Sequence, residues 1–179
     1  LINLGGAYVD TLSREEAAEL KAAGLPNPNR DRSVEENRAL FEDMIEGRFQ
    51  PGEAVLRIRS DPNAPDPALR DFVLFRMQLG GHPRKPDDVC WPVLDFQSAI
   101  DDYELEITHI IRGIDLQAST RKQQILYEFF GWDYPEVEYW GRVNVLDENE
   151  VPISFSSSAY AKGIKDGVYS GWDDPELFT

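Results

Sequence analysis

The sequence predicts an α/β protein in which half of a doubly wound parallel sheet follows a separate α+β unit. In the second half of the chain, a strand pattern that ends at Arg112 precedes a helix pattern over 119–132, as a parallel sheet requires. In the first half, two helix patterns precede alternating strand patterns, which favours an inserted α+β unit. Because such sheets bind ligands at the carboxyl ends of their strands, the first site candidates are Arg112, ending "ITHIIR", and Asp95, ending "VCWPVLD".

Both helix patterns of the first half carry start and stop signals. In each, a serine precedes a glutamate by three residues, the spacing of a capping box, and a glycine ends the run: Ser13–Glu16 with Gly24, and Ser33–Glu36 with Gly47. The second helix is expected to present one apolar face, made of Leu40, Phe41, Met44 and Ile45.

Three strand patterns follow these helices. "EAVLRIRSD" alternates and places Ala54, Leu56 and Ile58 on one side. "FVLFRMQL" is the second strand pattern, and "VCWPVLDF" is the third, expected to be buried with apolar residues on both faces.

The rest of the chain alternates between short strands and helices. A short helix or turn is expected over 96–106, followed by a strand over 107–113. The helix over 119–132 has Ile125, Leu126, Phe129 and Phe130 as its apolar face. A hairpin formed by 137–145 and 151–155, and a short helix over 159–167, complete the prediction.

The charge is strongly acidic, with 33 acidic and 18 basic residues, a formal net charge of -15 and only five lysines. This balance argues against non-specific nucleic-acid binding, which depends on neutralising phosphates, so no DNA partner is expected, but it leaves room for a local arginine patch. Acidic, lysine-poor chains are also typical of salt-loving organisms, where the charge serves solubility. No apolar run approaches the roughly 20 residues of a membrane helix, so no membrane association is expected.

The single Cys90 permits no intrachain disulfide, and a buried structural thiol in a cytoplasmic protein is expected. One cysteine and two histidines do not indicate a structural metal site.

Residue chemistry alone leaves the candidate site open. Arg112 suits a ligand carboxylate because a guanidinium binds carboxylates in a bidentate manner, but its spacing favours an ordinary ion pair with Asp115. His109, inside an apolar strand, is more often a hydrogen-bonded core residue than a catalyst. Several arginines could face a phosphate or simply solvate a strand: Arg57, Arg59 and Arg70. The acidic pairs are expected to be solvated or capping carboxylates: Asp101–Asp102 and Asp173–Asp174.

Several longer strings occur in one order: "AYVDTLSREEAAEL", "NRDRSVEENRALFEDMIEGRFQPGEAVLRIRSD", "AIDDYELEITHIIRG", "STRKQQILYEFFGWDYPEV" and "GWDDPEL". Together they resemble the glutamyl- and glutaminyl-tRNA synthetases and, through "THIIRGIDLQASTRKQ", most of all the archaeal glutamyl enzymes. The resemblance covers nearly the whole chain. It implies that glutamate is activated with ATP, which is accompanied by Mg²⁺, and transferred to a glutamate-type tRNA by a monomeric enzyme.

The resemblance also implies a domain organisation. It is that of a class I Rossmann-type catalytic domain split by an acceptor-stem-binding α+β insertion. Residues 1–10 would end the first Rossmann half, 11–89 would form the insertion, and 90–179 would form the second half. The first half, with the family's HIGH signature for ATP, has no counterpart here, so we expect a fragment that is inactive by itself.

Site residues follow from the same resemblance. Arg112 matches the arginine that meets the side-chain carboxylate of glutamate, where glutaminyl enzymes have another residue. Asp95 lies in the segment that matches the family's "YDF", but its tyrosine is replaced here by Leu94. Leu94, Asp95 and Ser98 are therefore expected to take part in substrate binding.

A degenerate KMSKS-type loop is expected at 156–159, on Ser156, Ser157, Ser158 and Ala159. The two family lysines that would stabilise the pyrophosphate leaving group are replaced by Ser157 and Ala159, and losing one such donor costs about 3 kcal/mol. In one interpretation the synthetase works through backbone N–H groups, serine hydroxyls and Lys162 or Lys165. In another, the chain belongs to an impaired paralogue that binds tRNA or a protein. A glutaminyl or dual-specificity enzyme is a third interpretation.

Overall fold

The computed structural model describes residues 1–80, 82–141 and 157–175, in two compact units, Leu1–Trp140 and Gly141–Thr179. Short 3-10 turns accompany the helices and strands of the first unit: Ile2–Leu4, Pro28–Asp31, Pro67–Leu69 and Ile114–Leu116. Among the residues described, no helix has the length and apolar character that crossing a bilayer demands.

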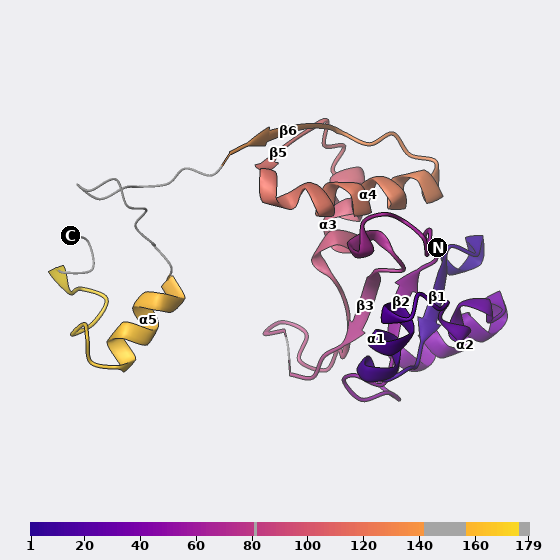
Figure 1. Ribbon diagram of the computed structural model, residues 1–179, viewed down its shortest axis with the longest axis horizontal. Helices are drawn as coiled ribbons and strands as arrows, with labels where there is room; N and C mark the ends of the chain where they lie inside the picture. Colours follow the sequence, from indigo (N-terminus) through magenta and orange to yellow (C-terminus); the bar gives the residue numbers. More distant parts are fainter. Residues whose placement is uncertain (81, 142–156, 176–179) are drawn as a thin grey trace. The chain divides into compact units, whose positions relative to one another are not determined.

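A four-stranded antiparallel sheet begins the first unit, with its strands in chain order (Figure 1). The strands are β1 (Ala7–Asp10), β2 (Val55–Ile58), β3 (Val73–Met77) and β4 (Cys90–Pro92). The predicted inward side of β2 is confirmed, because Ala54, Leu56 and Ile58 are all buried. Strands from all three segments expected above, 1–10, 11–89 and 90–179, meet in this one sheet, and the domain division stays a prediction.

Two helices flank this sheet, α1 (Arg14–Ala22) and α2 (Val34–Ile45). Both predicted capping boxes are present: the serine hydroxyl accepts from the glutamate N–H, and the carboxylate accepts from the serine N–H. The predicted apolar face of α2 is wrong at Ile45, which is 58% exposed. The buried stripe follows helical spacing from Asn37 to Met44, with Leu40 and Phe41 packed on the core, and Ile45 lies one position beyond it.

The predicted buried strand "VCWPVLDF" is also wrong. Only Cys90–Pro92 is extended, and these residues are half-buried because β4 pairs with a single described neighbour, β3. Val93 caps helix α3 (Leu94–Glu104), so Asp95 lies in the first turn of a helix and not at the end of a strand. A proline is tolerated in β4 because an edge strand leaves one row of backbone groups unpaired.

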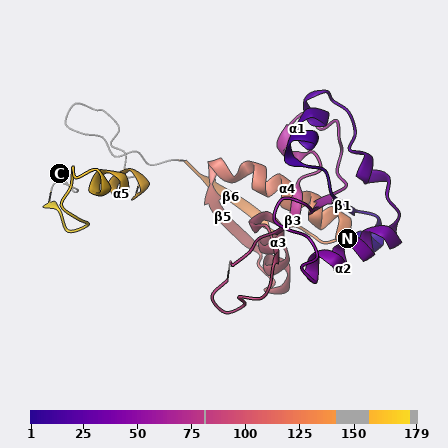
Figure 2. The same cartoon turned by 90° about the horizontal axis from the view of Figure 1, so that it is seen from below.

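The second part of this unit has the predicted strand–helix–strand order. Strand β5 (His109–Gly113) is followed by α4 (Gln117–Phe130) and then by β6 (Glu136–Trp140), which pairs in parallel with β5. Figure 1 and Figure 2 both show α4 running alongside the two strands. This parallel pair confirms the α/β expectation for the second half of the chain.

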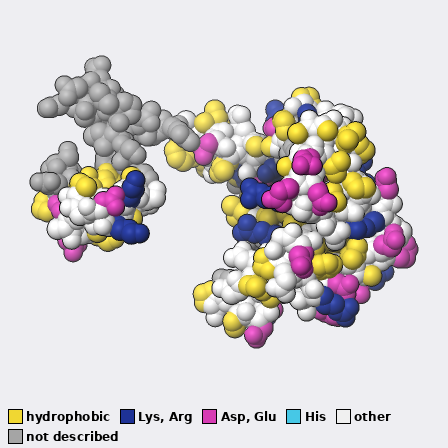
Figure 3. All heavy atoms as spheres, turned by 60° about the horizontal axis from the view of Figure 1, so that its bottom comes forward, with side chains coloured by type: hydrophobic (Ala, Val, Ile, Leu, Met, Phe, Trp, Pro, Cys, Tyr) yellow, Lys and Arg dark blue, Asp and Glu magenta, His cyan; other side chains and the backbone are white. Residues whose placement is uncertain are grey.

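Large apolar side chains remain on the surface of this parallel pair. Ile111 is 76% exposed and Trp140 is 54% exposed. Figure 3 shows hydrophobic, acidic and basic side chains interspersed over the surface facing the viewer.

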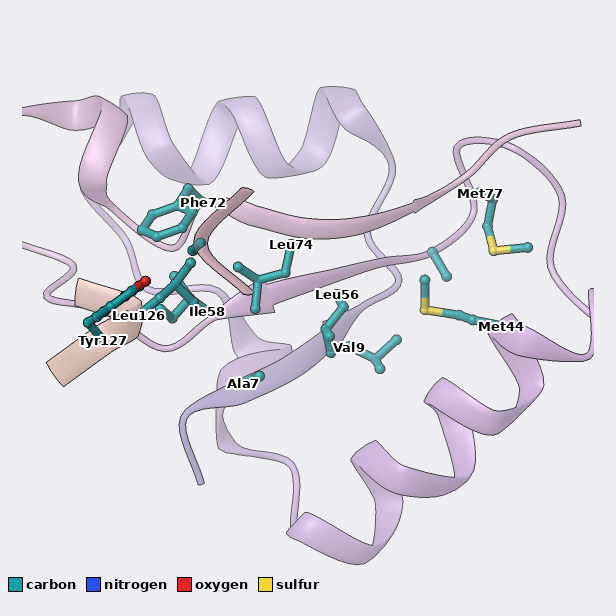
Figure 4. Close-up of a cluster of buried hydrophobic side chains, with 12 residues drawn as sticks. Ala7, Val9, Met44, Leu56, Ile58, Phe72, Leu74, Met77, Leu126 and Tyr127 are labelled. Carbon is teal, nitrogen blue, oxygen red and sulfur yellow. The ribbon is translucent and has the colours of Figure 1, made fainter. Parts of the chain in front are cut away.

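The main core lies between the sheet, α2 and α4 (Figure 4). The sheet contributes Val9, Ile58 and Leu74, and α4 contributes Leu126 and Tyr127, at 0% and 2% exposure. Because α4 buries these side chains against the antiparallel sheet, the packing that holds the sheet also fixes α4, the helix beside β5.

The second unit contains helix α5 (Ser157–Lys165). It confirms the predicted short helix but begins two residues earlier. It ends where the Val168 N–H donates to the Gly163 carbonyl at 2.8 Å and Gly167 adopts a left-handed φ of 76°. The second strand of the predicted hairpin, 151–155, lies outside the described residues.

Candidate functional site

Arg112 lies one residue before the carboxyl end of β5, as the sequence predicts. Alternate residues of a strand face opposite sides, and here Ile110 and Arg112 are half-buried while His109 and Ile111 are exposed. The Arg112 side chain therefore extends on the side of the sheet that carries α4.

Two buried side chains of α4 bind the Arg112 guanidinium. Its Nη1 donates to Gln123 Oε1 at 2.9 Å and to Thr120 Oγ1 at 3.2 Å. Thr120 and Gln123 are 3% and 1% exposed, and they share a helix face because they are three residues apart. Within the described ranges, no carboxylate lies within 4.0 Å of this guanidinium, so the expected ion pair with Asp115 is not formed.

Gln123 extends this contact into a network that includes a second predicted site residue. Its Nε2 donates to Ser98 Oγ at 2.6 Å, and Ser98 Oγ donates to the Leu94 carbonyl at 2.8 Å. The Tyr134 hydroxyl donates to Gln123 Oε1, also at 2.6 Å. The network therefore joins α3, β5, α4 and the segment before β6.

The hydrogen-bond partners of Arg112 in this network are neutral groups. Burial raises the pKa of Tyr134 to about 12, although the nearby Arg112 opposes this, so the phenol stays protonated and donates its hydrogen bond at neutral pH. Burial also raises the pKa of Asp102, against the opposing effect of Arg112. Asp102 is thus close enough to interact electrostatically with Arg112, but it makes no ion pair with it.

The other two substrate-binding candidates lie outside this network. Asp95 forms an ion pair with Lys122 Nζ at 2.8 Å, and the two side chains are 18% and 21% exposed. The side chain of Leu94 is not part of the network, and the residue is 74% exposed at the start of α3. The structure therefore brings Arg112 and Ser98 together and places Asp95 in a separate contact.

Most of the remaining candidate residues form hydrogen bonds or ion pairs with other residues of this chain. Each of the three arginines proposed for phosphate donates to a backbone carbonyl: Arg57 to Asp71, Arg59 to Arg30 and Arg70 to Ala64. His109 is not the core residue that its apolar strand predicts, because it is exposed and lies 3.5 Å from Glu136. The Asp174 carboxylate accepts from the Ser170 N–H at 2.6 Å within a turn, not at a helix end.

The serine run is helical where the structure describes it. Ser157, Ser158 and Ala159 form the first turn of α5, so the expected loop is wrong at these three positions, and Ser156 lies outside the described residues. Lys162 is in the last turn and follows Ser158 by four residues, which places both on one helix face.

The hollows of the described part of the chain include two whose linings bear on the site. One of about 410 Å³ lies beside the loop after α3 and is lined mainly by acidic and aromatic side chains, including Asp102, Glu104, Glu106 and Tyr127. The other, of about 680 Å³, lies next to α1 and is lined by apolar residues with Arg14, Arg57 and Arg70. In the same parts of the chain, no three His, Cys, Asp or Glu side chains gather in a way that could hold a metal ion.

Sequence reasoning missed Gln123, Thr120 and Tyr134. A signal for the first two is present, because they continue toward the amino end of α4 the stripe that Leu126 and Tyr127 occupy, so burial could have been inferred from helical spacing. Tyr134 follows the helix in an irregular segment, where no periodicity places its side chain.

Residues 1–179 match the family model described as "tRNA synthetases class I (E and Q), catalytic domain". A glutamate–tRNA ligase of Haloarcula marismortui is 51% identical over the whole of this chain, which covers 31% of that protein. The glutamate–tRNA ligase of Methanothrix thermoacetophila is 47% identical, with the same two shares. This chain thus spans about a third of the length of these curated relatives.

Solved structures give the same fold. A glutamate–tRNA synthetase from Elizabethkingia anophelis superposes with a TM-score of 0.51 at 23% identity, over 90% of this chain and 34% of that one. A glutamate–tRNA ligase from Elizabethkingia meningosepticum, in complex with its amino acid, gives a TM-score of 0.52 at the same identity. These findings confirm the family resemblance and the α/β fold class.

Proposed function

Because the chain belongs to the class I tRNA synthetase (E and Q) family, through its catalytic domain, we propose that the full-length protein is a glutamate–tRNA ligase. It would activate glutamate with ATP, release pyrophosphate, and transfer the glutamyl group to a glutamate-type tRNA. The names of curated relatives at about half identity support this proposal. The acceptor-stem role of residues 11–89, the monomeric state and the cytoplasmic location stay predictions.

The observation that carries the proposal is the environment of Arg112. A guanidinium at the carboxyl end of a parallel strand, bound by neutral groups through Nη1, keeps its positive charge for a ligand. A cation favours the carboxylate of glutamate over the neutral amide of glutamine, because only the carboxylate gains a charge-assisted, bidentate contact. Ser98 is the second proposed substrate-binding residue. It is linked to Arg112 by two hydrogen bonds, both made by the Gln123 side chain.

We propose that α5 binds the pyrophosphate leaving group. Ser157 and Ser158 present hydroxyls in its first turn, and the amino end of a helix favours phosphate through its dipole. Lys162, on the same face as Ser158, would supply the positive charge that the family's loop lysines provide. Mg²⁺ would accompany ATP as part of the substrate.

A second candidate function rests on those missing lysines. Ser157 and Ala159 stand where the resemblance implies cations, and this difference favours a paralogue that binds tRNA or a protein without activating an amino acid. The two functions differ in one measurable step, the formation of the adenylate.

Glutamate-dependent ATP–pyrophosphate exchange by the full-length protein tests the choice. The assay should include tRNA and be run at low and at high salt, since an acidic surface is expected to respond to ionic strength. Exchange above background with glutamate supports the ligase, whereas its absence in every condition supports the paralogue. Charging of glutamate and glutamine tRNA in parallel then separates single from dual specificity.

A further inference from the structure

Gln123 is a buried polar side chain whose amide oxygen and amide nitrogen both form hydrogen bonds. The residue is 1% exposed, and its contacts run to three other elements of the fold. Burying an amide is unfavourable unless it is hydrogen-bonded, and here both ends of the amide have partners. The position therefore requires a specific group and not merely a side chain of suitable volume.

The hydrogen bonds allow only one orientation of this amide. An arginine has only donors, so the atom that faces Arg112 Nη1 must be the amide oxygen. Nε2 is then directed at Ser98 Oγ, whose own proton is donated to the Leu94 carbonyl. Since the Arg112 Nη1, Gln123 Nε2 and Ser98 Oγ donors each meet an acceptor, the network holds the guanidinium in one place.

The acceptor that holds Arg112 is also neutral. A carboxylate in the same place would form an ion pair with Arg112 and compensate its charge, whereas an amide binds it and leaves the charge intact. Within the described residues, all hydrogen bonds of this side chain start from Nη1. Nε and Nη2 therefore remain for a ligand carboxylate.

We propose that Gln123 is a positioning residue that sets the preference for glutamate over glutamine by fixing Arg112 without neutralising it. This proposal rests on the proposed function of Arg112 as the group that binds the substrate's side-chain carboxylate. It assigns specificity to a residue of α4 that is buried and shares no hydrogen bond with Asp95 or Lys122.

The test is Gln123→Glu in the full-length protein, with Gln124→Glu as the matched control. Both variants add one negative charge to adjacent positions of α4, but Gln124 is exposed. Binding of glutamate and of glutamine is measured by calorimetry, independently of ATP. In Gln123→Glu, the Kd for glutamate is expected to rise about 10- to 100-fold, the size of a lost charge-assisted contact, while that for glutamine changes little.

The outcomes separate this proposal from the proposed function. If Gln124→Glu behaves as wild type and Gln123→Glu loses glutamate selectively, the proposal stands, and exchange kinetics should show a raised KM with little change in kcat. Equal loss of both amino acids would show a merely structural role and overturn it, as would unchanged selectivity. If the wild-type protein binds no glutamate, the proposed function fails as well.

A second variant serves if Gln123→Glu does not fold. Gln123→Met keeps a neutral side chain of similar length and removes the anchor but not the charge of Arg112. It should weaken glutamate binding by a smaller factor and retain a preference for glutamate. If Gln123→Met lost the preference for glutamate, this would contradict the claim that an uncharged side chain at position 123 is what preserves it.

Discussion

Two arginines in and beside the antiparallel sheet, Arg57 and Arg30, have carboxylate partners, and Arg112 in the parallel pair does not, in the part of the chain that the structure describes. In the antiparallel sheet, Arg57 Nε binds the Asp10 carboxylate at 2.6 Å, and beside it, in the 3-10 turn Pro28–Asp31, Arg30 Nε lies 3.1 Å from the Asp71 carboxylate. Beside the parallel pair, Arg112 is held by two neutral side chains. Carboxylates therefore pair with Arg57 and Arg30 inside the fold, whereas Arg112 makes no ion pair among the described residues, and the experiments below test whether this difference marks Arg112 as a ligand-binding residue.

The burial of Asp10 shows why its pairing is structural. The residue is 1% exposed, and its carboxylate also accepts from Asn29 Nδ2 at 3.0 Å and from the Leu12 N–H at 3.1 Å. Burial alone would raise its pKa, but hydrogen bonds from Asn27, Arg57, Asn29 and Leu12 outweigh it and hold the pKa below the usual value. Such a group stabilises the fold only while all its partners remain.

Removing the Asp10 carboxylate should give the largest change in stability. Asp10→Ala leaves Arg57 partly buried without its partner, which costs about 3 kcal/mol in the free energy of unfolding. Urea unfolding followed by circular dichroism measures it. A loss of less than about 1 kcal/mol would show that the pair is dispensable and that the two regions do not differ.

The pH dependence of stability also tests the structural role of Asp10. Because the pKa of Asp10 is lowered in the folded protein, its contribution is present in full above the unfolded pKa of about 3.9 and is lost as the pH falls through the folded pKa. Asp10→Asn cannot titrate, so its stability should fall less steeply in acid than that of wild type. If the free energy of unfolding fell equally steeply with pH in wild type and in Asp10→Asn, Asp10 would not be the titrating group.

The sequence predicted those parts of the fold that depend on local spacing. Both capping boxes, the alternation in β2 and the helix behind β5 follow from neighbours within a few residues, and all are confirmed. The wrong predictions depend on distant partners. Residues 90–92 became a short edge strand because only β3 pairs with them, and Asp95 entered a helix whose residues pack against α4. Likewise, spacing alone could not show that Arg112 pairs with Gln123 and not with Asp115.

Arg112→Gln should cost much less stability than the loss of Asp10. Arg112 is half-buried and its direct partners are neutral, so truncation leaves no unpaired buried charge, and a loss of about 1 kcal/mol is expected. The same urea unfolding experiment measures it. A loss as large as that of Asp10→Ala would mean that Arg112 has a structural role like that of Arg57.

An exposed ion pair should give the smallest effect. Asp43 binds Arg48 at 2.5 Å, but the arginine side chain is 63% exposed. Solvent screening limits such pairs to roughly 0–1 kcal/mol, so Asp43→Ala should leave the urea midpoint almost unchanged. It is the exposed counterpart of Asp10→Ala, because both remove a carboxylate bound to an arginine, although Arg48 keeps a second partner in Glu46. If Asp43→Ala and Asp10→Ala lost equal free energy of unfolding, burial would not explain the effect of Asp10→Ala.

The most direct test of the central claim is the amino-acid preference of Arg112→Gln in the full-length protein. Binding of glutamate and glutamine is compared with wild type under identical salt. A charge reserved for the substrate predicts that glutamate binding weakens by at least about 10-fold and that the preference for glutamate disappears. An unchanged affinity and an unchanged preference for glutamate would remove Arg112 from the site.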